Sequence, residues 1–422
     1  MTRRSPSATS LLLLAVSLAA FVALCVVQRA PMADALVYRA EGAAVLDGGG
    51  DLYGFTVTRW HLPATYPPFA ALLFTPAAWL PVPAVKAAFL AGNALLLARL
   101  VQLSARLAGR PLGSSALCAA TALALWLEPV FQTVLFGQVN LVVTVLVLWD
   151  LTRPPGAPGR GVALGIAAGI KLTPALFVVH LLLRGRRREA ATATAASGAT
   201  ALLGALALPA ASADFWTRRL YDTGRVGKPW IVDNQSLQGL TARLLGDPAP
   251  GPAWALPALA VAVCGLWLAA RAARERHAVL LTAFTALLVS PVSWSHHWVW
   301  CVPLIAVLLA DGHLRTALLT TALFTARTMW LLPHQGDLDL RLPWWQQPLA
   351  APYPLLGCAL LAGAACRGRR AAPVPEDPWW PGTAARPQVP ARRDRSSPDP
   401  ALAPAERPRQ PSDSSSSAST IR

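Results

Sequence analysis

Residues 10–28 read SLLLLAVSLAAFVALCVVQ, and this stretch decides the class of fold. It carries no charged side chain, and a helix of about 20 residues spans the hydrocarbon core of a bilayer because each residue rises about 1.5 Å. Apolar runs of similar length recur as far as about residue 366. We therefore predict an all-α polytopic membrane protein with about 10–12 transmembrane helices, since helices satisfy their own backbone hydrogen bonds in lipid.

The composition supports the same class of protein. Of the 422 residues, 54% are hydrophobic and only 14% are charged, whereas soluble domains carry about 25% charged residues. The formal net charge is +16, but the Lys and Arg residues stand in short clusters between apolar runs and in the C-terminal tail. Such clusters are typical of positive-inside anchors rather than of a basic stripe that binds nucleic acid. The lipid bilayer is the expected partner, and nucleic acid is not.

The chain divides into three parts by composition. Residues 1–9 form a short basic N-terminus, and the absence of a clear cleavage site predicts that the first apolar run is an uncleaved helix. Residues 10–366 form the multi-spanning domain. Residues 367–422 are basic and rich in Pro, Ala and Ser without apolar periodicity, which predicts a disordered tail. The basic clusters predict that both termini of this multi-pass cell-membrane protein are cytoplasmic.

Residues 161–183 are unusual because basic residues flank both ends, with Arg160 before and RGRRR (184–188) after. The middle reads GIKLTP (169–174), where a lysine is costly in hydrocarbon and Pro174 interrupts a helix. One interpretation is a hairpin of two half-helices of about ten residues, with Lys171 near its apex. A single kinked span is the alternative.

The predicted topology collects polar motifs at the outer boundary of the membrane. These motifs are Asp34, TYPPF (65–69), GQVN (137–140), DNQS (233–236) and SWSHHW (293–298). Each has an ordinary structural explanation as well: a solvated loop acid, a rigid turn, helix-to-helix hydrogen bonds, or interfacial tryptophans. Their clustering on one face nevertheless predicts an extracytoplasmic site.

Two features limit the chemistry of that site. His296 and His297 are adjacent, so on a helix they point about 100° apart and make a poor metal clamp; no metal is expected. The chain also has neither a phosphate-binding G-x-x-x-x-G-K-[ST] loop nor a G-x-G-x-x-G signature. A membrane-soluble donor therefore fits better than a nucleotide, and no cofactor is expected.

The ordered motifs resemble those of glycosyltransferase family 87, actinobacterial membrane transferases of the GT-C architecture that include α-1,2-mannosyltransferases. The resemblance covers about residues 10–366. It is carried by Asp34 and Tyr38, LY (52–53), TYPPF (65–69), GQVN (137–140), GIAAGIKLTP (165–174), NQSLQG (234–239) and SPVSWSHHW (290–298). It implies a GT-C-like helical bundle whose extracytoplasmic loops form the site.

The resemblance also implies roles for particular residues. Asp34 corresponds to the first-loop aspartate of the family, the proposed general base. Positive charge near the departing phosphate would come from Lys171, Arg218, Arg219 or Arg225. The other candidates are substrate-binding residues: Tyr38, Tyr66, Gln138, Asn140, Asn234, Gln235, His296 and His297. One position departs from the family pattern, because Ser295 stands where an acidic residue is common, and this could alter the acceptor preference.

The implied function is transfer of a hexose, with mannose favoured, from a polyprenyl-phosphate donor to a hydroxyl of an extracytoplasmic glycolipid or glycan. No metal takes part in this scheme. The alternative is a flippase for lipid-linked sugars or a small-solute transporter. A transporter would tend to show broken helices in corresponding places of two halves, and the sequence shows one clear break.

Overall fold

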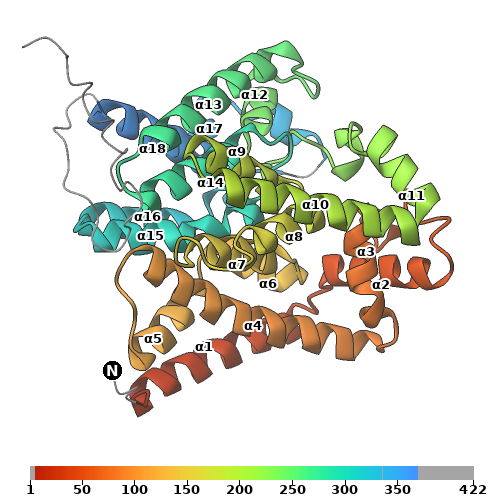
Figure 1. The fold of residues 1–422 in the computed structure, drawn as a ribbon, viewed down its shortest axis with the longest axis horizontal. Coiled ribbons are helices and arrows are strands. Elements are labelled where there is room, and N and C mark those ends of the chain that lie inside the picture. The colour runs from red at the N-terminus through yellow and green to blue at the C-terminus, as the bar shows by residue number, and fades with distance from the viewer. Residues whose placement is uncertain (1–4, 335, 369–422) are drawn as a thin grey trace, which may run out of the picture. The chain divides into compact units, whose positions relative to one another are not determined.

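The computed structural model describes residues 5–334 and 336–368. The predicted tail lies outside the described residues except for its first two positions, and so do Arg3 and Arg4 of the N-terminus. The described chain is helical, with two short strands (Figure 1). This confirms the predicted all-α class.

Most helices follow one another with short connections, and three longer segments join α2 to α3, α11 to α12 and α16 to α17. They are α1 (Ala8–Val27), α2 (Ala33–Leu46), α3 (Pro68–Ala78), α4 (Val82–Leu107), α5 (Ser114–Ala124), α6 (Glu128–Phe136), α7 (Asn140–Leu151), α8 (Val162–Ile170), α9 (Leu176–Leu183), α10 (Arg187–Ala207), α11 (Pro209–Asp214), α12 (Leu237–Leu245), α13 (Pro252–Arg271), α14 (Glu275–Val289), α15 (Cys301–Ala310), α16 (Leu314–Ala326), α17 (Gln347–Ala350) and α18 (Pro352–Gly368). Strands β1 (Thr56–Val57) and β2 (Leu62–Pro63) pair antiparallel between α2 and α3.

The long helices confirm several membrane-length apolar runs. Helices α1, α4, α10 and α13 are long and apolar enough to cross a bilayer, and the number rises to six if each of two bent helix pairs counts as one span. Four further apolar segments are only 10–17 residues long, too short for a hydrocarbon core of about 30 Å at about 1.5 Å per residue. The described helices thus give fewer full-length spans than the 10–12 predicted, because several predicted spans are broken.

The break between α5 and α6 has an identifiable cause. The two helices meet at 78°, and the bend falls just before Pro129 in the first turn of α6. Proline cannot donate to the preceding turn, and its ring clashes with the carbonyl group four residues earlier, so a regular helix does not continue through Pro129. The bend ends α5 early and directs α6 toward the cavity described below.

Residues 161–183 form the predicted hairpin. Helix α8 ends at Lys171, whose backbone is extended (φ −147°, ψ 130°), and Pro174 lies in a short 3₁₀ turn (Thr173–Ala175) before α9. Helix α8 packs closely on α10: a Cβ added at Gly165 would lie 2.4 Å from the carbonyl oxygen of Ala193. Small residues that allow such an approach are typical of helix pairs in membranes.

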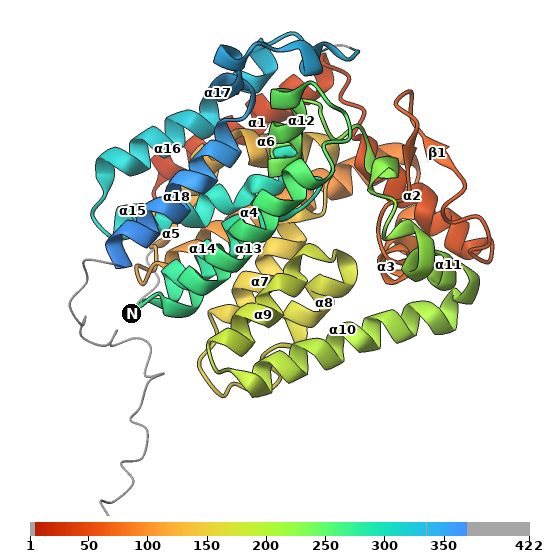
Figure 2. The same ribbon diagram turned by 90° about the horizontal axis from the view of Figure 1, so that it is seen from above.

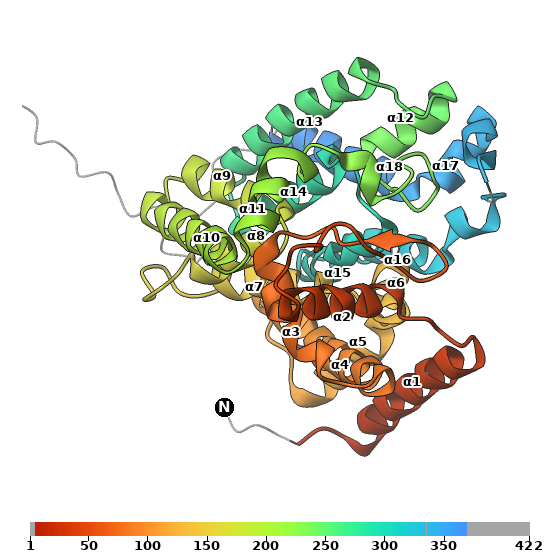
Figure 3. The same ribbon diagram turned by 90° about the vertical axis from the view of Figure 1, so that its right-hand side faces the viewer.

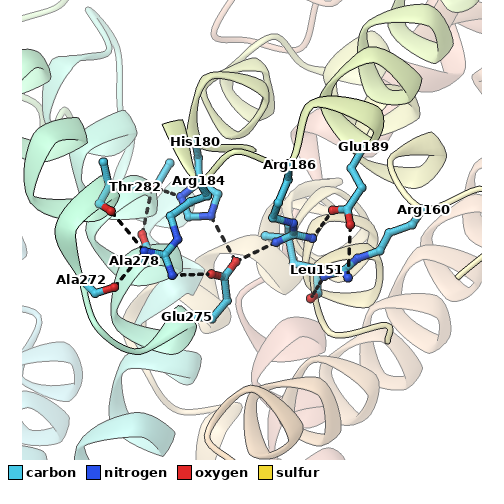
Figure 4. A network of polar contacts seen from close by, with 11 residues as sticks. Leu151, Arg160, His180, Arg184, Arg186, Glu189, Ala272, Glu275, Ala278 and Thr282 are labelled. Carbon is cyan, nitrogen blue, oxygen red and sulfur yellow. Dashed lines mark hydrogen bonds and ion pairs between the residues drawn. The ribbon is translucent and has the colours of Figure 1, made fainter. Parts of the chain in front are cut away.

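The two ends of the hairpin lie together in one polar network (Figure 4). Arg160, just before α8, is 3.4 Å from Glu189. Arg184, just after α9, is 3.3 Å from Glu275. Arg186 joins the two halves, since it pairs with both glutamates. A single span would place Arg160 and Arg184 on opposite sides of the bilayer, about 35 Å apart if it were straight. The two arginines instead lie in one network, so the kinked-span alternative is excluded.

Helices α2, α3 and α11, together with residues 47–67 and 215–219, form a cap beside the long helices. Helix α2 lies beside α3 and α4 (Figure 3), and α10 runs from beside α9 to α11 (Figure 2). Leu52, Tyr53 and Phe215 share a small apolar core in this cap. The cap therefore brings the segment that follows α11 close to α2.

Candidate active site

A cavity of about 580 Å³ lies between the cap and the hairpin. Its wall comes from α2, the segment 60–67, the connection from α6 to α7 at residues 136–138, the hairpin apex at 171–173, the segment 215–233 and residues 290–297. Trp330 and His334 complete it. Segments far apart in the sequence thus meet around a space large enough for a sugar, since ligand pockets measure about 300–1,000 Å³.

Asp34 faces this cavity from the first turn of α2. A carboxylate is favoured there because the helix dipole places partial positive charge at the N-terminus. Burial raises the pKa of Asp34 to about 7, although a hydrogen bond from Gln138 and the charge of Lys171 lower it and Asp233 raises it. A base with a pKa near the working pH is well suited to proton abstraction.

Gln138 is held in place by two tyrosines. The Tyr38 and Tyr66 hydroxyls donate to its Oε1 at 2.8 and 3.1 Å, which leaves the amide nitrogen as the donor to Asp34. Gly137 has φ 70°, and a Cβ there would lie 2.7 Å from that of Ala35, so glycine allows the end of α6 to approach α2. Tyr38 and Tyr66, two predicted substrate-binding residues, therefore also orient Gln138.

Lys171 is fixed from two sides. Its Nζ donates to Oδ1 of Asn140 at 3.0 Å and lies 2.9 Å from Nε2 of His297. It also lies 5.6 Å from the centre of the Tyr66 ring. Asn140 in turn donates through Nδ2 to the carbonyl oxygen of His296 at 3.0 Å. Contacts from α7 and the SWSHHW segment thus hold the Lys171 side chain of the hairpin apex at the cavity.

The predicted arginines separate into two groups. Arg219 and Arg225 line the cavity, whereas Arg218 is exposed and does not. Arg225 donates to the carbonyl oxygens of Ala64, Thr65 and Arg219. It therefore holds the TYPPF segment against the loop after α11. Arg219 pairs with Asp214 at 2.8 Å.

His296 and His297 both line the cavity, from a 3₁₀ helix (Ser295–Trp300). Their rings meet edge to face, with centroids 4.8 Å apart. Within residues 5–334 and 336–368, no group of three or more His, Cys, Asp or Glu side chains could hold a metal ion. The role of the two histidines in substrate binding stays a prediction.

Three predicted substrate-binding residues do not line the cavity. Asn140 contacts Lys171 and the backbone of His296, as described above. Asn234 donates to the carbonyl oxygens of Pro229 and Pro291, and Gln235 donates to those of Val232 and Ala350. These side chains shape the walls of the site from behind.

Asp233 lines the cavity but was not among the predicted site residues. It is the first residue of DNQS, but the spacing of that motif gives no sign of which side chain faces the cavity. Its negative charge raises the pKa of Asp34. Asp222 lines the cavity as well, so the lining carries three carboxylates, those of Asp34, Asp222 and Asp233.

Sequence comparison places the chain in a family. The family model described as glycosyltransferase family 87 matches residues 64–291, which is more than half of the chain. The chain belongs to glycosyltransferase family 87. Asp34 lies before the matched stretch, and His296 and His297 lie after it. The chain is thus a membrane glycosyltransferase.

Curated relatives of this family 87 chain cover most of its length. A polyprenol-phosphate-mannose-dependent α-(1-2)-phosphatidylinositol mannoside mannosyltransferase of Mycobacterium tuberculosis is 34% identical over 78% of this chain and 84% of its own. The protein of the same name from Mycolicibacterium smegmatis is also 34% identical, over 76% and 80%. A phosphatidylinositol pentamannoside mannosyltransferase of M. smegmatis is 37% identical over 64% and 67%. No solved structure matches significantly.

Proposed function

We propose that this protein transfers a mannosyl group from polyprenyl-phosphate mannose to a hydroxyl of a phosphatidylinositol mannoside. The names of the relatives supply both substrates, since they describe a polyprenol-phosphate-mannose donor and phosphatidylinositol mannoside acceptors. The observation that carries the proposal for this chain is the cavity in which Asp34 faces a site that also holds Lys171.

Asp34 is the general base of the proposed reaction. Its carboxylate accepts the proton of the acceptor hydroxyl as that oxygen forms a bond to the anomeric carbon. The bond from the anomeric carbon to the phosphate oxygen breaks, and polyprenyl phosphate leaves with the electron pair. The donor phosphodiester carries one negative charge, and the polyprenyl phosphate that leaves is a monoester with a second negative charge, so the protein must stabilise the charge that builds on the leaving oxygen.

Lys171 stabilises that leaving oxygen in the proposed scheme, with Arg219 as a second cation on the cavity wall. Lys171 is already oriented by Asn140 and His297, so little rearrangement is needed when charge develops. Arg225 contributes chiefly through the backbone carbonyls that it holds. Arg218 is a weaker candidate because it lies outside the cavity.

The cavity opens to the extracytoplasmic side in this proposal. Arg160, Arg184 and Arg186 mark one end of the hairpin, and Lys171 at the apex marks the other. Basic clusters lie on the cytoplasmic side of membrane proteins, so the apex and the cavity point outward. Both termini are cytoplasmic in this topology.

Cysteine labelling tests the orientation. In a background where exposed Cys264 and Cys366 are replaced by serine, an impermeant thiol reagent added to intact cells should label Asp51→Cys. It should label Ala157→Cys and Arg187→Cys only after permeabilisation. Labelling of Ala157→Cys and Arg187→Cys from opposite sides would overturn the hairpin as well as the orientation.

Transfer itself is tested with purified protein in proteoliposomes. Radiolabelled polyprenyl-phosphate mannose and a phosphatidylinositol mannoside should yield a labelled glycolipid longer by one hexose. Label that crosses the membrane without joining the acceptor would instead favour the flippase or transporter alternative.

A further inference from the structure

The turn at residues 229–236 is held by buried polar side chains. Arg243 is 1% exposed, and it donates to the carbonyl oxygens of Trp230, Ile231 and Asn234. Unpaired buried carbonyls would destabilise the fold, so Arg243 fixes the path of this turn from beneath. Burial lowers the pKa of Arg243 to about 10, which leaves the guanidinium charged at neutral pH.

Two other side chains fix the turn from its flanks. Asp339 accepts a hydrogen bond from the backbone N–H of Val232 at 3.0 Å. Asn234 accepts one from the N–H of Ser293 at 2.9 Å and donates to Pro229 and Pro291. The turn is therefore joined to the segment that carries the histidines and to the loop after α16.

Gln235 completes the arrangement from the side of α18. Its Nε2 donates to Val232 and Ala350 at 2.6 and 2.7 Å, and its Oε1 accepts from the N–H of Tyr353 at 3.2 Å. Asn234 and Gln235 are each fully buried. The two side chains that follow Asp233 along the chain, those of Asn234 and Gln235, thus pack behind the cavity wall.

Asp233 is the polar side chain of this turn that lines the cavity. The backbone N–H of Ser295 reaches both the carbonyl oxygen of Asp233, at 2.8 Å, and its Oδ1, at 3.1 Å. Among the described residues no Lys, Arg or His forms an ion pair with the carboxylate. Burial raises the pKa of Asp233, and hydrogen bonds from Ser295 lower it.

The chemistry of an unpaired carboxylate limits what it binds. A donor phosphate is anionic and would be repelled, and the substrate groups that remain are sugar hydroxyls, which donate strong hydrogen bonds to a carboxylate. Asp34 shares the cavity and is the base that takes one acceptor proton. Because Asp233 lines the same cavity as Asp34, its carboxylate can hold another hydroxyl of the same sugar.

We infer that Asp233 recognises the acceptor by accepting a hydrogen bond from a sugar hydroxyl other than the one that Asp34 deprotonates. This inference rests on the proposed function. It places the acceptor sugar in the part of the cavity next to Asp233. The anionic donor group then lies toward Lys171 and Arg219. The rigid turn gives the carboxylate a fixed position, which is what selection among sugar hydroxyls requires.

The test compares Asp233→Asn with wild type in proteoliposomes. Asparagine keeps the shape and the oxygen that accepts from Ser295 but loses the charge. The KM for phosphatidylinositol mannoside should rise about tenfold or more, since hydrogen bonds to charged groups contribute about 1.5–3 kcal/mol. The KM for polyprenyl-phosphate mannose should stay within about twofold. The matched control is Asp247→Asn, because Asp247 is an exposed aspartate that follows α12 and does not line the cavity.

Each outcome decides the inference. An unchanged acceptor KM in Asp233→Asn, with active wild type, overturns the role of Asp233 and leaves the proposed function standing. Equal increases in both KM values, or a lower melting temperature than Asp247→Asn, indicate a structural role and also overturn it. If wild type transfers no mannose, the proposed function fails, and the inference fails with it.

Discussion

Nζ of Lys171 lies 2.9 Å from Nε2 of His297. This contact joins the apex of the α8–α9 hairpin to a segment more than 120 residues later in the chain. When Lys171 is an ammonium it donates but cannot accept, so Nε2 of His297 is then the acceptor and the proton of the neutral ring is on Nδ1. The pair gives the cavity a cation whose position is set by protein groups rather than by substrate.

Replacing Lys171 should therefore impair use of the donor. We expect Lys171→Met to raise the KM for polyprenyl-phosphate mannose by about tenfold or more, because it removes a charged hydrogen-bond donor to phosphate. The KM for the acceptor should change less. Steady-state kinetics with each substrate varied in turn measures both values.

The control for this change is Lys228→Met. Lys228 is exposed, pairs with Asp337 at 2.9 Å and does not line the cavity. It should leave both KM values near those of wild type. A donor KM for Lys171→Met that matched the control would remove Lys171 from the phosphate site.

The acidic side of the pH profile should report Asp34. Burial raises the pKa of this carboxyl to about 7, and only the ionised form can accept a proton. Activity should therefore fall as the pH drops below about 7, by about tenfold per pH unit. The midpoint is read from kcat/KM measured between pH 5 and pH 9.

A substitution of Gln138 tests whether the pKa of Asp34 sets this acidic limb. The hydrogen bond from Gln138 lowers the pKa of Asp34, so Gln138→Met should raise that pKa and move the acidic limb to higher pH. A shift to lower pH, or no shift in a folded variant, would show that Gln138 does not act on Asp34.

The packing of the hairpin on α10 can be tested with single methyl groups. A Cβ at Gly165 would approach the backbone of Ala193, which cannot move without shifting α10. We expect Gly165→Ala to destabilise the protein by about 1–3 kcal/mol. Gly198 lies on α10 with open space around its missing Cβ, so Gly198→Ala should be neutral or stabilise by up to about 1 kcal/mol. Thermal melting in detergent compares the two, and equal melting temperatures would contradict the close packing of α8 and α10.

Several features of the fold were predictable from the sequence because membrane physics constrains them strongly. Long, predominantly apolar runs predicted α1, α4, α10 and α13. The hairpin followed from basic residues at both ends of 161–183 and from Lys171 and Pro174 between them. The bend at α5–α6 was missed because apolar residues continue on both sides of it, and only Glu128 and Pro129 mark the break.

The site was predictable in part for a different reason. Motif spacing led to Asp34, Lys171 and Gln138, which the structure brings together around one cavity. It did not show that Asn234 and Gln235 face away from the cavity while Asp233 faces it. In an irregular turn the direction of each side chain is set by tertiary hydrogen bonds, here from Arg243 and Asp339, and no local periodicity reveals it.

The most direct test of the central claim is the turnover of Asp34→Asn in proteoliposomes with radiolabelled polyprenyl-phosphate mannose and phosphatidylinositol mannoside. Asparagine keeps the size of the side chain but cannot accept the proton. We predict that kcat falls by about 10²- to 10⁴-fold, with donor KM and melting temperature close to those of wild type. Transfer at the wild-type rate would contradict the assignment of Asp34 as the base.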